Sequence, residues 1–163
     1  FRKEAEAAFA MWQAAANIRF SEISDPATAG IVIGAQVAPT GRAFANVSHH
    51  ASNGPVAEIE RAQICLNPDT PWKVGFNGNV DVYDLRYAIA HENGHAICLD
   101  HPQTAQALMS YKYNEQFREL QQSDRAGAVA LYGARDLKHA AAQTDAWNVL
   151  AAAHLLSLPA PEQ

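Results

Sequence analysis

His91, Glu92 and His95 form the pattern His-Glu-Asn-Gly-His inside a segment with helical periodicity, and this pattern constrains the chain more than any other feature. Residues four apart return to the same face of an α-helix, so the two histidines can point at one ion. Neutral imidazole suits Zn²⁺, and Glu92 stands where it can serve as a general base toward a zinc-activated water. Five residues alone are also compatible with two surface histidines on an amphipathic helix.

A third histidine, His101, stands six residues after His95, which is too far to continue the same helical face. A chain that leaves the helix and turns back can present it to the same ion. A catalytic zinc needs three protein ligands and one open position, which these three histidines supply. Met109 follows eight residues later, within Ala-Leu-Met-Ser-Tyr.

The stretch HENGHAICLDH resembles the metzincin zinc motif HExxHxxGxxH, and Met109 falls where that family has the methionine of its Met-turn. The short spacing from His101 to Met109 resembles the matrixins, and the likeness to the bacterial matrixin-type peptidases extends over roughly residues 2–133. The resemblance implies an α+β metzincin (zincin-like) domain, with a twisted mixed sheet and a long zinc-site helix. It also implies a zinc-dependent endopeptidase, with Glu92 as general base and one catalytic zinc on His91, His95 and His101.

Composition supports one ordered domain, since 48% of the 163 residues are hydrophobic and 18% are charged. A formal charge of -5 argues against a nucleic-acid partner. The longest apolar stretch, from Val149 to Leu158, is interrupted by His154 and Ser157 and is too short to span a membrane. The chain begins at Phe1 without a signal peptide, so it reads as processed or truncated, and secretion is an expectation from the resemblance alone.

Periodicity and turn residues predict the remaining elements. We expect helices over residues 2–17, from Asp81 through the zinc motif, from Ser123-Asp124 to Gly133, and over 136–158, with strands over 31–35, 43–48 and 60–66. The matrixin-like peptidase domain would cover residues 1–134, and residues 135–163 would form a helical C-terminal extension. The resemblance also implies a strand before the first helix, which is either cut away or replaced by another segment.

Cys98 departs from the family pattern, which has a glycine there to end the zinc helix. We expect a left-handed backbone at Cys98, at a cost of about 1 kcal/mol or more for a residue with a Cβ. A buried thiol is the favoured interpretation, and a disulfide with Cys65 is left open.

Tyr111 is a second departure, because matrixins usually carry proline at that place. Methionine followed two residues later by tyrosine is similar to astacins and serralysins, in which the tyrosine approaches the zinc. Tyr111 is therefore either a fifth zinc ligand and donor to the transition state, or a packed tyrosine with its hydroxyl on the backbone.

Further metal sites are expected to differ from the family. Arg42 and Cys65 stand where matrixins hold histidines of a structural zinc, so no second zinc is expected, and His49 and His50 are interpreted as solvated. A calcium site near Asn67 and Asp69 is a conjecture.

A protein or peptide substrate is expected to add as a strand to an exposed edge at about residues 61–66, with residues 111–117 as the wall of the main pocket. Side-chain preference and oligomeric state stay open. The alternatives are a catalytically silent peptide-binding module and a zinc-binding protein without proteolysis. A non-proteolytic zinc hydrolase is disfavoured by Met109.

Overall fold

The computed structural model describes residues 1–37, 41–54, 57–135 and 148–153. Within them the helices are α1 (Arg2–Ala15), α2 (Leu85–Ala96) and α3 (Gln122–Tyr132). The main sheet has the order β1 (Arg19–Glu22), β7 (Asn148–Ala153), β2 (Ile31–Ala35), β4 (Ile59–Leu66) and β3 (Ala43–His49). Two short parallel strands, β5 (Trp72–Lys73) and β6 (Tyr83–Asp84), form a second sheet. Among the described residues, none of the helices has the length and hydropathy that a bilayer-spanning segment requires.

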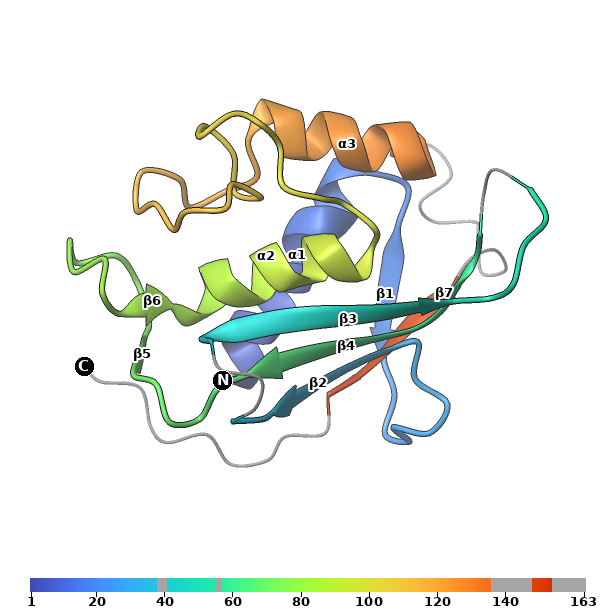
Figure 1. Ribbon diagram of the computed structural model, residues 1–163, viewed down its shortest axis with the longest axis horizontal. Helices are drawn as coiled ribbons and strands as arrows, with labels where there is room; N and C mark the ends of the chain where they lie inside the picture. Colours follow the sequence, from blue (N-terminus) through green and yellow to red (C-terminus); the bar gives the residue numbers. More distant parts are fainter. Residues whose placement is uncertain (38–40, 55–56, 136–147, 154–163) are drawn as a thin grey trace.

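The main sheet is mixed, as expected. β1, β7, β2 and β4 run parallel to one another, whereas β3 pairs antiparallel with β4. The expectation that residues 61–66 form the free edge is wrong, because β2 and β3 flank β4 on both sides. β3 lies at the edge of the sheet, and α2 packs over β3 and β4 (Figure 1).

The segment of residues 148–153 is a strand, so the predicted helix over 136–158 is wrong at these residues; its remainder lies outside the described residues. Residues 149–153 are a continuous apolar run, a pattern that fits a strand with neighbours on both sides as well as a helix. The segment is extended because it pairs in parallel with β1 on one side and β2 on the other. Residues 148–153 thus belong to the sheet of the predicted peptidase domain, and a C-terminal segment fills an internal place in it.

The core forms where α1 and α2 pack together above the sheet. Trp12 is fully buried, and its indole N–H donates to the carbonyl of Ala90 in α2 at 2.9 Å. Arg86 of α2 pairs with Glu4 of α1 at 2.8 Å. The sheet contributes large buried side chains from its parallel strands: Ile31, Ile33, Ile64 and Leu66. These contacts hold the helix with the zinc motif firmly against the rest of the domain.

Helix α2 begins three residues later than predicted, with Asp84 and not Asp81 as its N-cap. The Asp84 carboxylate accepts hydrogen bonds from the amide of Tyr87 at 2.9 Å and from Gly75 at 2.6 Å. Residues 83–84 are extended because they pair with β5, so the helix cannot start before them. The cap therefore joins the helix start to the loop after β5.

Candidate active site

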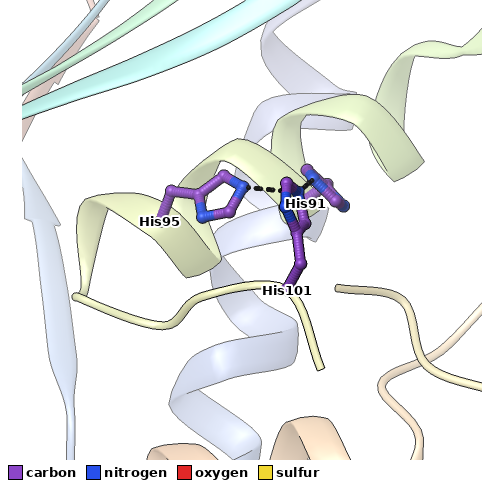
Figure 2. A group of neighbouring side chains, drawn as sticks. All are labelled: His91, His95 and His101. Atoms are coloured by element: carbon purple, nitrogen blue, oxygen red, sulfur yellow. Dashed lines mark hydrogen bonds between the residues drawn. The ribbon is translucent and has the colours of Figure 1, made fainter. Parts of the chain in front are cut away.

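Three histidine rings converge at the end of α2 (Figure 2). His91 and His95 project from α2, and His101 reaches them from the segment that follows the helix. The Nε2 atom of His101 lies 3.1 Å from Nε2 of His91 and 3.1 Å from Nε2 of His95. Zn–N bonds of about 2.0–2.1 Å in tetrahedral geometry place ligand nitrogens about 3.3 Å apart. The donor set predicted from the motif is therefore brought together at a spacing that fits zinc.

Backbone carbonyls fix the orientation of two of the rings. His91 Nδ1 lies 2.9 Å from the carbonyl oxygen of Leu108, and His95 Nδ1 lies 2.8 Å from that of Leu99. Each Nδ1 donates, so the lone pair of a neutral ring is on Nε2, facing the other histidines. Burial lowers the pKa of His91 to about 4 and also lowers the pKa of His95, which keeps both rings neutral near pH 7. Both rings are ready to bind a metal.

The predicted Met-turn lies directly beneath this site. The amide of Ser110 donates to the carbonyl of Ala107 at 3.2 Å, which closes the turn, and Met109 is 1% exposed. Its side chain packs on the zinc helix at Gly94, where an added Cβ would meet Met109 Sδ at 2.2 Å. The turn thus supports α2 between its two histidines.

Asp124 holds the Met-turn in place, a role that the sequence did not reveal. One carboxylate oxygen accepts from the amide of Leu108 at 2.8 Å and the other from the amide of Met109 at 3.0 Å. The same carboxylate caps α3 through the amide of Gln121 at 2.7 Å. The sequence pattern predicted only that Asp124 opens a helix, and no signal along the chain connects it to Met109. The peptide unit between Leu108 and Met109 donates its N–H to Asp124 and presents its carbonyl to His91. Asp124 therefore helps to orient His91 through this one peptide unit.

Glu92 borders a cleft of about 430 Å³ that also contains the three histidines. Its side chain is 8% exposed, and burial raises its pKa to about 7. A carboxylate with such a pKa can take and return a proton near neutrality. The cleft is lined by Arg42, Ala43, Phe44, Ala45, Tyr83, Tyr87, Ala88, His91, Glu92, His95, His101, Ser110, Tyr111 and Tyr113.

The sequence matches the family described as Matrixin over residues 1–133. The chain belongs to the matrixin family. It is 29% identical over 147 residues to matrix metalloproteinase-23 of Rattus norvegicus and 28% identical to its Homo sapiens counterpart, each match covering 83% of this chain and 38% of the relative. A stretch of 78 residues is 40% identical to matrix metalloproteinase-19 of Mus musculus, covering 47% of this chain and 14% of that protein. The chain thus spans well under half the length of these relatives.

Tyr111 of this matrixin stands at the mouth of the cleft. Its ring lies perpendicular to that of His101, with the centroids 5.4 Å apart. The side chain is 82% exposed, so it is not packed in the interior as one of the two interpretations required.

Cys98 has the predicted left-handed backbone, with φ at 67°. The expectation of a buried thiol is wrong, because Cys98 is exposed and its Sγ lies 3.3 Å from Nε2 of His49 at the end of β3. The left-handed turn ends α2 through hydrogen bonds to the carbonyls of His95 and Gly94, and it leaves the side chain outside the core. Cys65 is buried and both thiols are free, so no disulfide forms.

The conjectured calcium site near Asn67 gains no support from the local hydrogen bonds. The Asn67 amide group donates to the Gly41 carbonyl at 2.8 Å and accepts from the amide of Asp69 at 2.9 Å, as in an Asx turn. The next strand, β5, carries a buried cation of the protein, Lys73. The ammonium of Lys73 donates to Asn77 Oδ1 at 2.7 Å and pairs with Glu115.

Proposed function

We propose that this matrixin is a zinc-dependent endopeptidase with Glu92 as its general base. The observation that carries the proposal is the convergence of three histidine Nε2 atoms beside a buried carboxylate in an open cleft. Membership in the matrixin family supports the same reaction class.

We also propose an extracellular location, from family membership. Detection of the protein in cell lysate alone, and not in culture medium, would contradict this location.

The proposed hydrolysis gives the three histidines and Glu92 separate roles. His91, His95 and His101 would hold a zinc ion, which would supply Lewis acidity to make water nucleophilic near neutral pH and to stabilise charge on the carbonyl oxygen. Glu92 takes the proton of the attacking water and returns it to the leaving amine. Its raised pKa suits both steps, since the group must accept and then lose one proton in each cycle.

The substrate backbone is proposed to bind along β3, the edge strand, since residues 61–66 of β4 have a strand on each side. Residues 43–45 of β3 line the cleft beside the metal site. An extended peptide can hydrogen-bond to the free edge of such a strand, and its side chains then alternate between the cleft and solvent.

Tyr111 is proposed to donate a hydrogen bond to the carbonyl oxygen as negative charge develops there. Its exposed position beside His101 leaves the phenol free to approach a bound substrate. Tyr111→Phe is expected to lower kcat by more than about tenfold with little change in metal content. Unchanged kcat in this variant would remove Tyr111 from the mechanism.

The proposed function is tested by metal analysis and casein digestion on the parent and on Glu92→Ala. We expect one zinc per chain in both proteins, and proteolysis by the parent alone. Metal binding without proteolysis in the parent would favour a peptide-binding module or a zinc-binding protein. Equal digestion by both proteins would remove Glu92 as the base.

A further inference from the structure

Arg42 immediately precedes β3 and lines the cleft of the proposed active site. Its Nη2 donates to the backbone carbonyl of Asp81 at 2.5 Å, and its guanidinium carbon lies 4.7 Å from the centroid of the Tyr83 ring. Among the described residues no carboxylate forms an ion pair with it. The guanidinium is therefore oriented by a ring and a carbonyl, and no carboxylate in the described part of the chain neutralises its charge.

A wall of aromatic rings connects Arg42 to the metal site. Tyr83 stacks on Tyr113 with the centroids 4.2 Å apart, and Tyr113 packs edge-on against Tyr87 at 4.8 Å. The hydroxyl of Tyr87 donates to the Leu108 carbonyl, which is also the acceptor for His91. A peptide on the edge of β3 can thus lay an apolar stem on this wall, with Arg42 at the far end from the histidines.

The charges in the cleft favour a carboxylate at that end. Of the described residues that line the cleft, Arg42 has the one permanent positive charge, and Glu92 is the one carboxylate. A guanidinium stacked on a ring keeps its N–H edges available, and two of them match the two oxygens of a carboxylate.

We propose that Arg42 is a specificity-determining residue that binds a carboxylate of the peptide substrate, either a glutamate side chain or the carboxylate at the peptide's own C-terminus. The inference rests on the proposed peptidase function and specifies its substrate class. It predicts that the enzyme prefers a carboxylate at one position of the peptide, on the side of the cleaved bond nearest the start of β3.

The test uses matched peptides with Glu or Gln at successive positions around the cleaved bond, each with a free or an amidated C-terminus. We expect kcat/KM to be about tenfold higher for the carboxylate form at one position. In Arg42→Gln the ratio should fall to about one, and in Arg42→Lys to an intermediate value, because lysine keeps the charge without the paired donors. Arg118→Gln is the control: Arg118 stacks on Phe76 at 5.1 Å, outside the cleft, and its ratio should equal that of the parent.

A second readout separates this inference from the proposed function. Fluorescence anisotropy on zinc-loaded Glu92→Ala measures the Kd of the same peptides without turnover, and the carboxylate form should bind about tenfold more tightly. A tenfold difference in Kd, together with no cleavage by the parent, would support carboxylate binding by Arg42 and overturn the peptidase proposal. Two results would overturn the role of Arg42. One is equal Kd and equal kcat/KM for every Glu and Gln pair and for both forms of the C-terminus. The other is a carboxylate preference that is unchanged in Arg42→Gln.

Discussion

Met109 packs against Gly94 so closely that α2 has no room for a side chain there. A Cβ on Gly94 would lie 2.2 Å from Met109 Sδ, 2.8 Å from Met109 Cε and 2.9 Å from Cζ2 of Trp12. Gly94 stands between His91 and His95, so Met109 of the Met-turn and Trp12 of α1 both contact α2 beside the candidate metal site. Glycine is required here for close packing and not for an unusual backbone angle.

Gly94→Ala is therefore expected to be destabilising, although alanine is the better helix former. Overpacking should lower the free energy of unfolding by about 1–3 kcal/mol, measured by urea denaturation of the zinc-loaded protein. Gly34→Ala in β2 is the matched control, because an added Cβ there meets nothing within 4 Å. Equal effects of the two substitutions would contradict the packing account.

Asp124→Ala tests whether the carboxylate positions the metal site through the Met-turn. Loss of the hydrogen bonds to Leu108 and Met109 should weaken zinc affinity by about 10- to 100-fold, measured by competition with a chromogenic chelator. Ser123→Ala is the neighbouring control, since the Ser123 hydroxyl is buried without a partner among the described residues. A zinc affinity of Asp124→Ala equal to that of the control would show that Asp124 only caps α3.

Asn93 is fully buried on α2, and neither its amide nitrogen nor its oxygen has a hydrogen-bond partner among the described residues. An unpaired buried amide costs about 1–3 kcal/mol. Asn93→Leu keeps the branch at Cγ and the number of side-chain heavy atoms, and removal of the unpaired amide should raise the free energy of unfolding by about that amount. Asn93→Ala is the companion variant, because it removes the amide without adding volume; a loss of stability in both variants beyond that of an ordinary truncation would show that Asn93 has a partner, such as a buried water.

The buried Lys73 of β5 forms an ion pair with the largely buried Glu115, and this pair ties β5 to the segment after the Met-turn. Burial by itself would raise the pKa of Glu115, but hydrogen bonds from Lys73, Tyr113 and Gly78 hold that pKa below its usual value. The contribution of Glu115 to stability is thus fully present above the pKa of the unfolded carboxyl and is lost as the pH falls through the lower folded pKa.

Removing one partner of this pair should cost more than removing both. Lys73→Met alone should lower the free energy of unfolding by about 3–5 kcal/mol, and Lys73→Met with Glu115→Leu should recover much of that loss. Glu115→Gln should also flatten the loss of stability in acid. Urea unfolding across the acid range measures both effects; a double variant no more stable than Lys73→Met, or an unchanged acid slope, would contradict this account.

The convergence of the three histidines could be predicted because their pattern is local. His91 and His95 share one helical turn, and the distances to His101 and Met109 along the chain leave few ways to place them. The strands over 31–35, 43–48 and 60–66 were predicted within a residue or so of β2, β3 and β4, because β-branched and alternating apolar residues mark them.

The remaining features depend on partners distant in the sequence. Whether 148–153 is a helix or a strand is decided by β1 and β2, more than a hundred residues earlier. The free edge belongs to β3 because β2 takes the other side of β4, which strand propensities do not encode. Asp124 is placed against the Met-turn by hydrogen bonds from Leu108 and Met109, and Arg42 is placed in the cleft by Tyr83 and the Asp81 carbonyl. The periodicity of the sequence indicates none of these contacts.

Zinc titration of the metal-free protein, with cleavage of one fluorogenic peptide as the readout, tests the central claim most directly. Activity of the parent should rise linearly and level off at one zinc per chain. Glu92→Gln should bind one zinc with the same stoichiometry and show a kcat lower by at least about a hundredfold. Full activity in the metal-free parent, or equal kcat in the parent and Glu92→Gln at one zinc, would contradict the assignment of this site.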